Sequence, residues 1–289
     1  MSEKLLEVDH VTKSFVIGGL FGRGHFNAVD DVSFTLQAEK PEVLAIIGES
    51  GSGKTTLARM ILNAVAPTSG VIRFRGEALH QARGRRRRLE LIRQIQPILQ
   101  NPYEAFNPLK RVDRYLYASA VRLAGARSPK ARDEAADSAL QKVGLSLAEV
   151  KGRFPHELSG GQLQRTAIAR ALISSPSLIV ADEPVSMVDA SLRMSIVTLF
   201  RRLHDDLEVS ILYITHDLAT AYTISDRVII MQKGRVVETG STREVLTHPK
   251  HPYSILLKEA VLSPDDVGKG RLTAERGGAA APERAQTDN

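Results

Sequence analysis

Residues 48–55 read Gly48-Glu49-Ser50-Gly51-Ser52-Gly53-Lys54-Thr55, a match to the pattern GxxxxGK[ST]. The run before them, Val43–Ile47, is short, apolar and rich in β-branched residues, which predicts a buried parallel strand. The residues after them repeat apolar side chains at helical spacing, at Leu57, Ile61 and Ala64. The expected order is strand, glycine loop and helix, which is the context that a phosphate-binding loop of this pattern requires.

The residue types of this loop explain why it should bind a polyphosphate. Glycines let the backbone wrap around an anion, and the following helix N-terminus adds amide donors and a positive dipole end. We expect Lys54 to reach the outer phosphates and the Thr55 hydroxyl to ligate Mg²⁺. The sequence therefore predicts a nucleoside triphosphate site. Its phosphate-binding residues are Gly48, Glu49, Ser50, Gly51, Ser52, Gly53, Lys54, Thr55 and Thr56.

Composition narrows the class of protein. Hydrophobic residues make up 43% and charged residues 25% of the 289, which is ordinary for a globular protein of one large or two smaller domains. The chain has no cysteine, which excludes disulfides and cysteine-ligated zinc or iron–sulfur clusters. The N-terminus lacks the apolar core of a signal peptide, and the longest charge-free apolar stretch, 171–181, is far shorter than the ~20 residues of a membrane span. We expect a soluble, cytoplasmic protein.

The positive charge is concentrated in one part of the chain. The net charge is +6, but residues 83–132 hold 13 basic and 3 acidic side chains, a net of +10. Five of the six residues from Arg83 to Arg88 are arginines, which we expect to form an exposed loop. Such a block fits a solvated face, an anionic membrane surface or nucleic acid, and the solvated face is the simplest of these interpretations.

Strand and helix patterns alternate along most of the chain, which predicts an α/β fold with a mainly parallel sheet. Four glycines in residues 17–27 predict a loop, and the alanine-rich, helical residues 103–150 predict a small helical subdomain inserted into the core. From 263 onward, Pro, Gly, Ala and mixed charge predict a disordered tail. The expected strands are residues 3–15, 32–36, 43–47, 71–74, 178–181, 209–215, 227–232 and 235–238.

Polar side chains follow two more of the expected parallel strands. Asp182 and Glu183 come after residues 178–181, and His216 comes after residues 209–215. Because ligands of open α/β sheets bind at the carboxyl ends of the strands, we expect these groups to meet the phosphate loop there. Asp182 can hold Mg²⁺ through its water shell, Glu183 can polarise an attacking water, and His216 can bond the γ-phosphate or Glu183.

A second glycine turn precedes another expected helix. Ser159, Gly160 and Gly161 combine a helix cap, permissive backbone and a helix dipole, which together can bind an anion. The turn could instead be only a helix cap. However, the phosphate loop already accounts for one triphosphate, so a second anion site indicates that nucleotide is bound between two chains.

Together these segments resemble the nucleotide-binding subunit of an ABC transporter. The phosphate loop resembles Walker A, residues 158–162 an unaltered LSGGQ signature, and residues 178–183 Walker B with the catalytic glutamate. Residues 186–189 stand where the D-loop should be; they depart from its usual Ser-Ala-Leu-Asp but keep the aspartate. The resemblance assigns catalysis to Glu183 and to the switch histidine His216, and it makes the Q-loop Gln100 a Mg²⁺ ligand together with Thr55 and Asp182. The D-loop aspartate is Asp189, and the signature residues that would act at the partner's ATP are Ser159, Gly160, Gly161 and Gln162. Phe15 is the residue expected to stack on adenine, with Phe26 and Phe34 nearby.

The resemblance also implies an assembly. Two such ATPase subunits enclose two ATP molecules, each phosphate loop facing the partner's Ser159 turn. ATP closes the dimer and hydrolysis opens it, and the motion passes through the helical subdomain to two transmembrane permease subunits. For an importer, an extracytoplasmic solute-binding protein completes the set. The implied location is peripheral, on the cytoplasmic face of the bacterial inner membrane. The ATPase partner is either a copy or a different chain, with a different chain favoured.

Three segments resemble the oligopeptide/dipeptide importer subfamily. They are residues 100–108, residues 154–157 before the signature, and the His251-Pro252-Tyr253 motif near the C-terminus. The segment 155–165 looks more like the second ATPase subunit, the F-type. Members often carry a cysteine cluster that binds iron–sulfur, which this chain lacks. The implied fold is an α/β P-loop NTPase core with a mainly parallel sheet, an antiparallel β subdomain and an inserted helical subdomain. The implied domains are residues 1–100 and 158–240 for the ATPase core, 101–157 for the helical subdomain, 241–262 for the C-terminal motif segment and 263–289 for the tail.

The alternatives to a peptide-importing ATPase are another cargo, a nucleic-acid or ribosome partner, and a regulatory subunit that does not hydrolyse ATP. Glu104-Ala105-Phe106 replaces the usual Ser-Ser-Leu and keeps oligosaccharide import open, and the subfamily also includes nickel importers. A nucleic-acid or ribosome partner is disfavoured, because the chain has one cassette, no heptads, and no aromatics among residues 83–88. A regulatory subunit without hydrolysis is disfavoured by intact Lys54, Asp182, Glu183 and His216.

Overall fold

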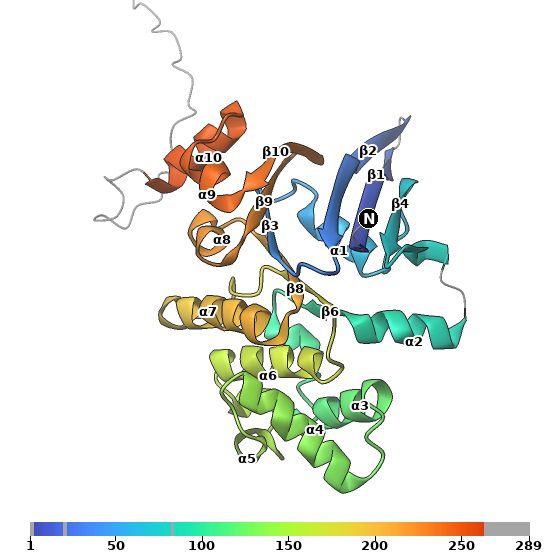
Figure 1. Ribbon diagram of the computed structural model, residues 1–289, viewed down its shortest axis with the longest axis vertical. Helices are drawn as coiled ribbons and strands as arrows, with labels where there is room; N and C mark the ends of the chain where they lie inside the picture. Colours follow the sequence, from blue (N-terminus) through green and yellow to red (C-terminus); the bar gives the residue numbers. More distant parts are fainter. Residues whose placement is uncertain (1–2, 20–21, 82–83, 263–289) are drawn as a thin grey trace, which may run out of the picture.

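The computed structural model describes residues 3–19, 22–81 and 84–262, which form two β-sheets and a set of helices (Figure 1). The larger sheet has the strand order β10-β9-β3-β8-β7-β6. Every neighbouring pair in it is parallel except β9 and β10, so the expected α/β class with a mainly parallel sheet is confirmed. Its strands are β3 (Val43–Ile47), β6 (Ile95–Ile98), β7 (Leu178–Asp182), β8 (Ser210–Thr215), β9 (Arg227–Gln232) and β10 (Arg235–Ser241).

The smaller sheet is antiparallel and has the order β2-β1-β4-β5. Its strands are β1 (Lys4–Gly19), β2 (Gly22–Gln37), β4 (Ser69–Phe74) and β5 (Glu77–Ala78). The helices are α1 (Lys54–Ile61), α2 (Arg85–Gln94), α3 (Asp113–Leu123), α4 (Pro129–Lys142), α5 (Leu147–Val150), α6 (Gly160–Leu172), α7 (Ala190–Leu207), α8 (Leu218–Ile224), α9 (Thr242–Thr247) and α10 (Pro252–Leu262).

Strand β3 organises the core because all five of its side chains are buried. Leu44 and Ile46 pack in the cluster that joins the parallel sheet to α1 and the antiparallel sheet. Ala45 and Ile47 point the other way, into the cluster with α8, α9 and α10. The alternation is that of a strand covered on both faces, which explains why its sequence reads as a continuous apolar run.

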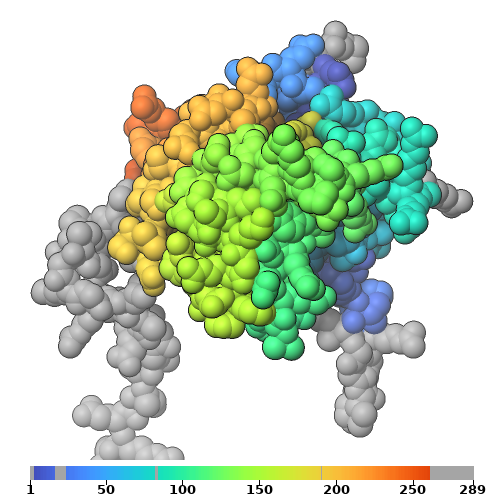
Figure 2. Space-filling view, turned by 90° about the horizontal axis from the view of Figure 1, so that it is seen from below, coloured from blue at the N-terminus to red at the C-terminus, as the bar shows by residue number. Residues whose placement is uncertain are grey.

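A separate group of helices forms the inserted subdomain. Buried side chains of α3, α4 and α6 share one cluster, which continues into β7 and β8 of the large sheet. Seen from below, residues of this group cover the centre of the molecule (Figure 2). The expected helical insertion is therefore present, and it is continuous with the core.

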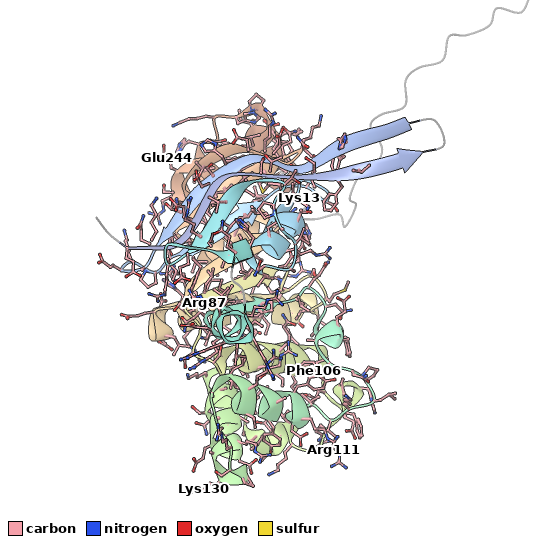
Figure 3. The ribbon with its side chains drawn as sticks, turned by 90° about the vertical axis from the view of Figure 1, so that its right-hand side faces the viewer. Lys13, Arg87, Phe106, Arg111, Lys130 and Glu244 are labelled. Carbon is pink, nitrogen blue, oxygen red and sulfur yellow. The ribbon has the colours of Figure 1, made fainter. Side chains whose placement is uncertain are left out.

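The structure corrects the expected loop at residues 17–27. Strands β1 and β2 run through this region as one long hairpin, with backbone pairs from Ser14↔Asn27 to Gly19↔Gly22. The hairpin projects beyond the rest of the protein (Figure 3). The four glycines misled the interpretation because a two-stranded ladder is held by backbone hydrogen bonds, which glycine makes as well as any residue does.

The structure also corrects the expected arginine loop. Arg85 to Arg88 form the first turn of α2, whereas Arg83 lies outside the described residues. Arg87, labelled in Figure 3, pairs with Glu90 one turn on, at 2.7 Å, and with Glu77 of β5. Leu91 is the buried side chain of the same helix. Arginine is a good helix former, so three such contacts are enough to order the segment.

The described part of the chain contains no helix that is both long and apolar enough to cross a membrane. The expected disordered tail, residues 263–289, lies outside the described residues.

Candidate nucleotide-binding site

The phosphate loop follows β3 and is closely surrounded by backbone. Gly53 has φ 102°, and a Cβ atom there would lie 2.1 Å from the carbonyl oxygen of Ala28. A Cβ on Gly48 would lie 2.2 Å from the carbonyl oxygen of Met231. Both positions therefore require glycine. Gly53 is also the N-cap of α1 and provides no side-chain cap, so the first amides of α1 remain available to a ligand.

Lys54 is held inside this loop. Its side chain is buried, and Nζ donates to the carbonyl oxygens of Gly48 at 2.7 Å and Glu49 at 2.8 Å. Burial lowers the pKa of Lys54, and the charges of Glu183, Asp182 and Glu49 oppose that shift. An ammonium group has three donors, so these two bonds fix its position, and the third donor, which has only a long 3.4 Å contact with Ser52 Oγ, can turn to a phosphate.

Thr55 and Asp182 meet across the site. Asp182 ends β7, and its Oδ1 accepts a hydrogen bond from Thr55 Oγ1 at 3.4 Å. Burial raises the pKa of Asp182, although the bond from Thr55 opposes the shift. Gln100 is exposed two residues beyond β6, whose Ile98 pairs with Ala181 of β7, so it lies at the same edge of the sheet. A hydroxyl and a carboxylate oxygen side by side suit a hard cation.

Glu183 and His216 form the other half of the site. His216 Nδ1 lies 2.8 Å from Glu183 Oε1 and 2.7 Å from Oε2. Glu183 has a backbone φ of 49°, and its amide donates to the carbonyl of Ile214 at 2.9 Å. This left-handed turn bends the chain out of β7 and directs the carboxylate toward the residue that follows β8. A carboxylate held by an imidazole can accept a proton from water.

The structure thus brings Lys54, Thr55, Asp182, Glu183 and His216 together, because β3, β8 and β7 are neighbours in the sheet. The register of the sheet aligns the ends of these strands, with Ile47 opposite Thr215 and Asp182 opposite Ile214.

The turn at Ser159 lies elsewhere in the fold. Ser159 Oγ accepts from the amide of Gln162 at 3.2 Å, and Gln162 Oε1 accepts from the amide of Ser159 at 3.0 Å. Helix α6, which this capping box opens, packs with the inserted helices, whereas α1 packs between the two sheets. Ser159 is exposed, and a Cβ on Gly160 would meet nothing within 4 Å. The turn is therefore accessible to a ligand from outside this chain.

Asp189 and Phe15 are also exposed. Asp189 occupies the N-cap position of α7 without a side-chain cap bond, and its carbonyl accepts from the amide of Arg193 at 3.0 Å. Phe15 lies on β1 opposite Phe26 of β2, and Lys13 Nζ is 5.3 Å from its ring centroid. Phe34 is buried in the core, which leaves Phe15 and Phe26 as the aromatic faces open to a base.

One contact of the phosphate loop was not expected from the sequence. The amide of Glu49 donates to the hydroxyl of Tyr253 at 3.0 Å, from α10. The His251-Pro252-Tyr253 motif was visible in the sequence, but its spacing gave no indication that it reaches the loop.

Comparisons with known proteins identify the family of the chain. Residues 29–186 match the family model described as ABC transporter, and residues 237–288 match the one described as oligopeptide/dipeptide transporter, C-terminal region. The chain is 39% identical over 265 residues to the oligopeptide transport ATP-binding protein OppF of Bacillus subtilis, covering 92% of this chain and 85% of that one. It is 40% identical over 250 residues to the dipeptide transport ATP-binding protein DppF of Haemophilus influenzae, covering 86% and 75%.

Solved structures show the same architecture. The dimeric, post-hydrolysis ATP-binding cassette MJ0796 bound to ADP and Pi superposes with a TM-score of 0.72 at 26% identity, over 82% of this chain and 99% of that one. The cassette cbiO1 of Clostridium perfringens, part of the ABC transporter complex cbiONQ, gives a TM-score of 0.70 at 25% identity, over 91% and 97%.

Proposed function

Because the chain belongs to the ABC transporter family and is one of its ATP-binding, ATP-hydrolysing subunits, we propose that it powers an importer of di- or oligopeptides. The observation that supports the chemistry best is the grouping of Lys54, Asp182, Glu183 and His216 at one edge of the parallel sheet. The cargo is supported by relatives at 38–40% identity that are named for oligopeptide or dipeptide transport.

In this proposal ATP binds with its phosphates in the loop of residues 48–56. The uncapped amides at the start of α1 and the third donor of Lys54 hold the outer phosphates. The adenine ring stacks on Phe15, which is exposed on β1.

The residues present fit a magnesium ion. Thr55 Oγ1 and Asp182 Oδ1, 3.4 Å apart, would hold it with Gln100, which lies two residues beyond the neighbouring strand β6. When bound, Mg²⁺ would supply positive charge that offsets the negative charge developing on the phosphates.

Glu183 is the proposed base and His216 the residue that positions it. Glu183 Oε1 or Oε2 accepts the proton of the attacking water, and the bond from His216, at 2.7–2.8 Å, fixes the carboxylate. In the reaction, the O–P bond to water forms as the bond to the leaving ADP oxygen breaks, and Glu183 takes the water's proton. The turn at Ser159, Gly160, Gly161 and Gln162 would contact the γ-phosphate held by a second ATPase subunit, with Asp189 beside that interface.

The proposed assembly pairs this chain with a second ATPase subunit, two permease chains and a solute-binding protein, at the cytoplasmic face of the bacterial inner membrane. A heterodimer is the favoured arrangement. Oligosaccharide or nickel import, which residues 104–106 kept open in the sequence, is not favoured, because the relatives are named for oligopeptide or dipeptide transport.

The test is purification of the tagged full chain from its own membranes, with every partner identified. Two multispanning chains and a solute-binding protein that binds peptides, but not oligosaccharides or nickel, are the expected result. Recovery of ribosomes or DNA-repair proteins without a permease would contradict the transport proposal and leave the ATPase chemistry standing.

A further inference from the structure

The phosphate loop is tied to the C-terminal segment by one hydrogen bond. Tyr253 of α10 and Glu49 of the loop are separated by 204 positions in the sequence, yet the Glu49 amide donates to the Tyr253 hydroxyl at 3.0 Å. Figure 1 shows α10 beside α9 and β10, at the end of the molecule away from the inserted helices. The contact therefore connects the nucleotide site to a segment outside the part of the chain that matches the ABC transporter model, residues 29–186.

The tyrosine is held rigidly in place. Its ring is buried with Ala45 and Ile47 of β3, the strand that ends in the phosphate loop. Its amide donates to His251 Nδ1 at 3.2 Å, so the histidine of the motif caps the start of α10. Pro252 opens the helix with a backbone angle that is already helical. All three residues of the His-Pro-Tyr motif thus contribute to placing one hydroxyl.

Glu238 of β10 fixes the entry to this motif. Its two carboxylate oxygens accept from the amides of Lys250 at 2.9 Å and His251 at 3.1 Å. A carboxylate that accepts two backbone amides is a strong, charge-assisted anchor. The segment from Lys250 to Tyr253 is therefore attached to the parallel sheet as well as to the loop.

Glu49 is held from both sides. Its amide is bonded to Tyr253, and its carbonyl accepts from Lys54 Nζ at 2.8 Å. The Glu49 carbonyl is one of the two groups that fix the Lys54 ammonium at normal hydrogen-bond distance. A shift of this residue would therefore displace the charge that is to bind phosphate.

We propose that Tyr253 is a positioning residue for ATP binding, which acts through Glu49 on Lys54 and makes the C-terminal segment part of the nucleotide site. The proposal rests on the function proposed above. It assigns the His-Pro-Tyr motif a role in ATP affinity, through a hydroxyl that does not itself touch the nucleotide.

The first test compares Tyr253→Phe with wild type in the full-length chain, by calorimetric titration with a slowly hydrolysed ATP analogue. Loss of one neutral hydrogen bond predicts a rise of about fivefold in the Kd of the analogue and in the KM for ATP, with kcat unchanged. Tyr117→Phe is the matched control, because the Tyr117 hydroxyl donates to Asp133 at 2.6 Å within the inserted helices. It should lower the Tm but leave the Kd of the analogue unchanged.

The second test is a double-mutant cycle with Glu238→Ala, which frees the motif but keeps the tyrosine. Alone, this variant should raise the Kd of the analogue about two- to fivefold. In the Tyr253→Phe background it should add nothing, because both changes act through the same bond. Glu238→Ala also keeps the proposal testable should Tyr253→Phe not fold.

A Kd for Tyr253→Phe within twofold of wild type would overturn the proposal, as would an equal rise in Tyr117→Phe or full additivity in the cycle. Absence of nucleotide binding by the wild-type chain would instead refute the proposed ATPase function.

Discussion

The phosphate loop and the turn at Ser159 are both glycine-containing turns that open a helix, but they differ in backbone conformation and in how the helix N-terminus is capped. The phosphate loop places Gly51 and Gly53 at positive φ and leaves the first turn of α1 without a side-chain cap. The turn at Ser159 has no positive-φ glycine and caps α6 with its own Ser159 and Gln162. The first turn therefore offers backbone amides to a ligand, whereas in the second turn two amides, those of Ser159 and Gln162, are already bonded to side chains.

The difference indicates what each turn can do alone. The phosphate loop can bind an anion within one chain, since its donors, its lysine and its surrounding backbone are all in place. The turn at Ser159, hereafter the signature turn, can offer the Ser159 hydroxyl, the glycine backbone and the helix dipole. These groups bind an anion more weakly than the phosphate loop does, so they need a ligand that is held by another chain. Five substitutions test this contrast.

The largest effect is expected for Glu183→Gln, which leaves both turns intact and removes the proposed base. We expect kcat to fall about a thousandfold with ATP affinity kept, because a general base contributes a factor of this order. With ATP, the variant should accumulate as a closed dimer with each signature turn on its partner's nucleotide. Size-exclusion chromatography with and without ATP checks this, and a loss of ATP binding would show that Glu183 has another role.

Lys54→Ala should have the next largest effect, on the phosphate loop alone. Loss of a charged donor to phosphate predicts a rise of about a hundredfold in the Kd for ATP, measured by calorimetry. Lys142→Ala is a control, since Lys142 ends α4 in the inserted subdomain and should leave the affinity unchanged. An unchanged affinity in Lys54→Ala would mean that the loop does not bind the phosphates.

Alanine substitutions at Gly53 of the phosphate loop and at Gly160 of the turn at Ser159 should affect stability and nucleotide-dependent dimer formation differently. Gly53→Ala is expected to lower the free energy of unfolding by about 3 kcal/mol, because Ala there is strained at φ 102° and its Cβ would meet the Ala28 carbonyl. Gly160→Ala should leave the Tm unchanged or raise it, since its Cβ meets nothing within 4 Å.

The same Gly160→Ala change should nevertheless weaken ATP-dependent dimer formation in the Glu183→Gln background, because in the proposed dimer the added methyl group would face the partner's nucleotide. Thermal denaturation and chromatography check the pair. A large loss of stability in Gly160→Ala would contradict the contrast between the turns.

Ser159→Ala should lower the free energy of unfolding by about 1 kcal/mol, which is typical of an N-cap and is the smallest of the expected losses. Ser128→Ala is the matched control, since Ser128 caps α4 through the amide of Ala131 at 3.1 Å. Both should lower the Tm alike, but only Ser159→Ala should prevent the closed dimer of Glu183→Gln. Equal dimer formation by the two would mean that the signature turn is only a cap.

The sequence predicted the centre of the molecule well. Val43–Ile47, the glycine loop and the strands ending at Asp182 and Thr215 were expected to meet, and they do, because a parallel sheet aligns the carboxyl ends of its strands. The grouping of Lys54, Asp182, Glu183 and His216 followed from that rule and from the resemblance to a known family.

The errors occurred where local composition and tertiary pairing disagree. The glycines of residues 17–27 predicted a loop, but the facing strand β2 supplies backbone partners that composition cannot indicate. The arginines at 85–88 became helical because Arg87 finds Glu77 and Glu90. The contact between Tyr253 and Glu49 joins two distant segments, which no local pattern can reveal.

At position 183, the stability of the backbone and the proposed catalysis favour different residues. A non-glycine residue at φ 49° costs about 1–3 kcal/mol, and Gly or Asn would adopt the same conformation at lower cost. A library at position 183 screened for heat resistance alone should therefore enrich Gly and Asn, while a screen for transport should retain only Glu. In the proposed mechanism, the sharp bend that aims the carboxylate at His216 is thus an unfavourable backbone conformation that places the base.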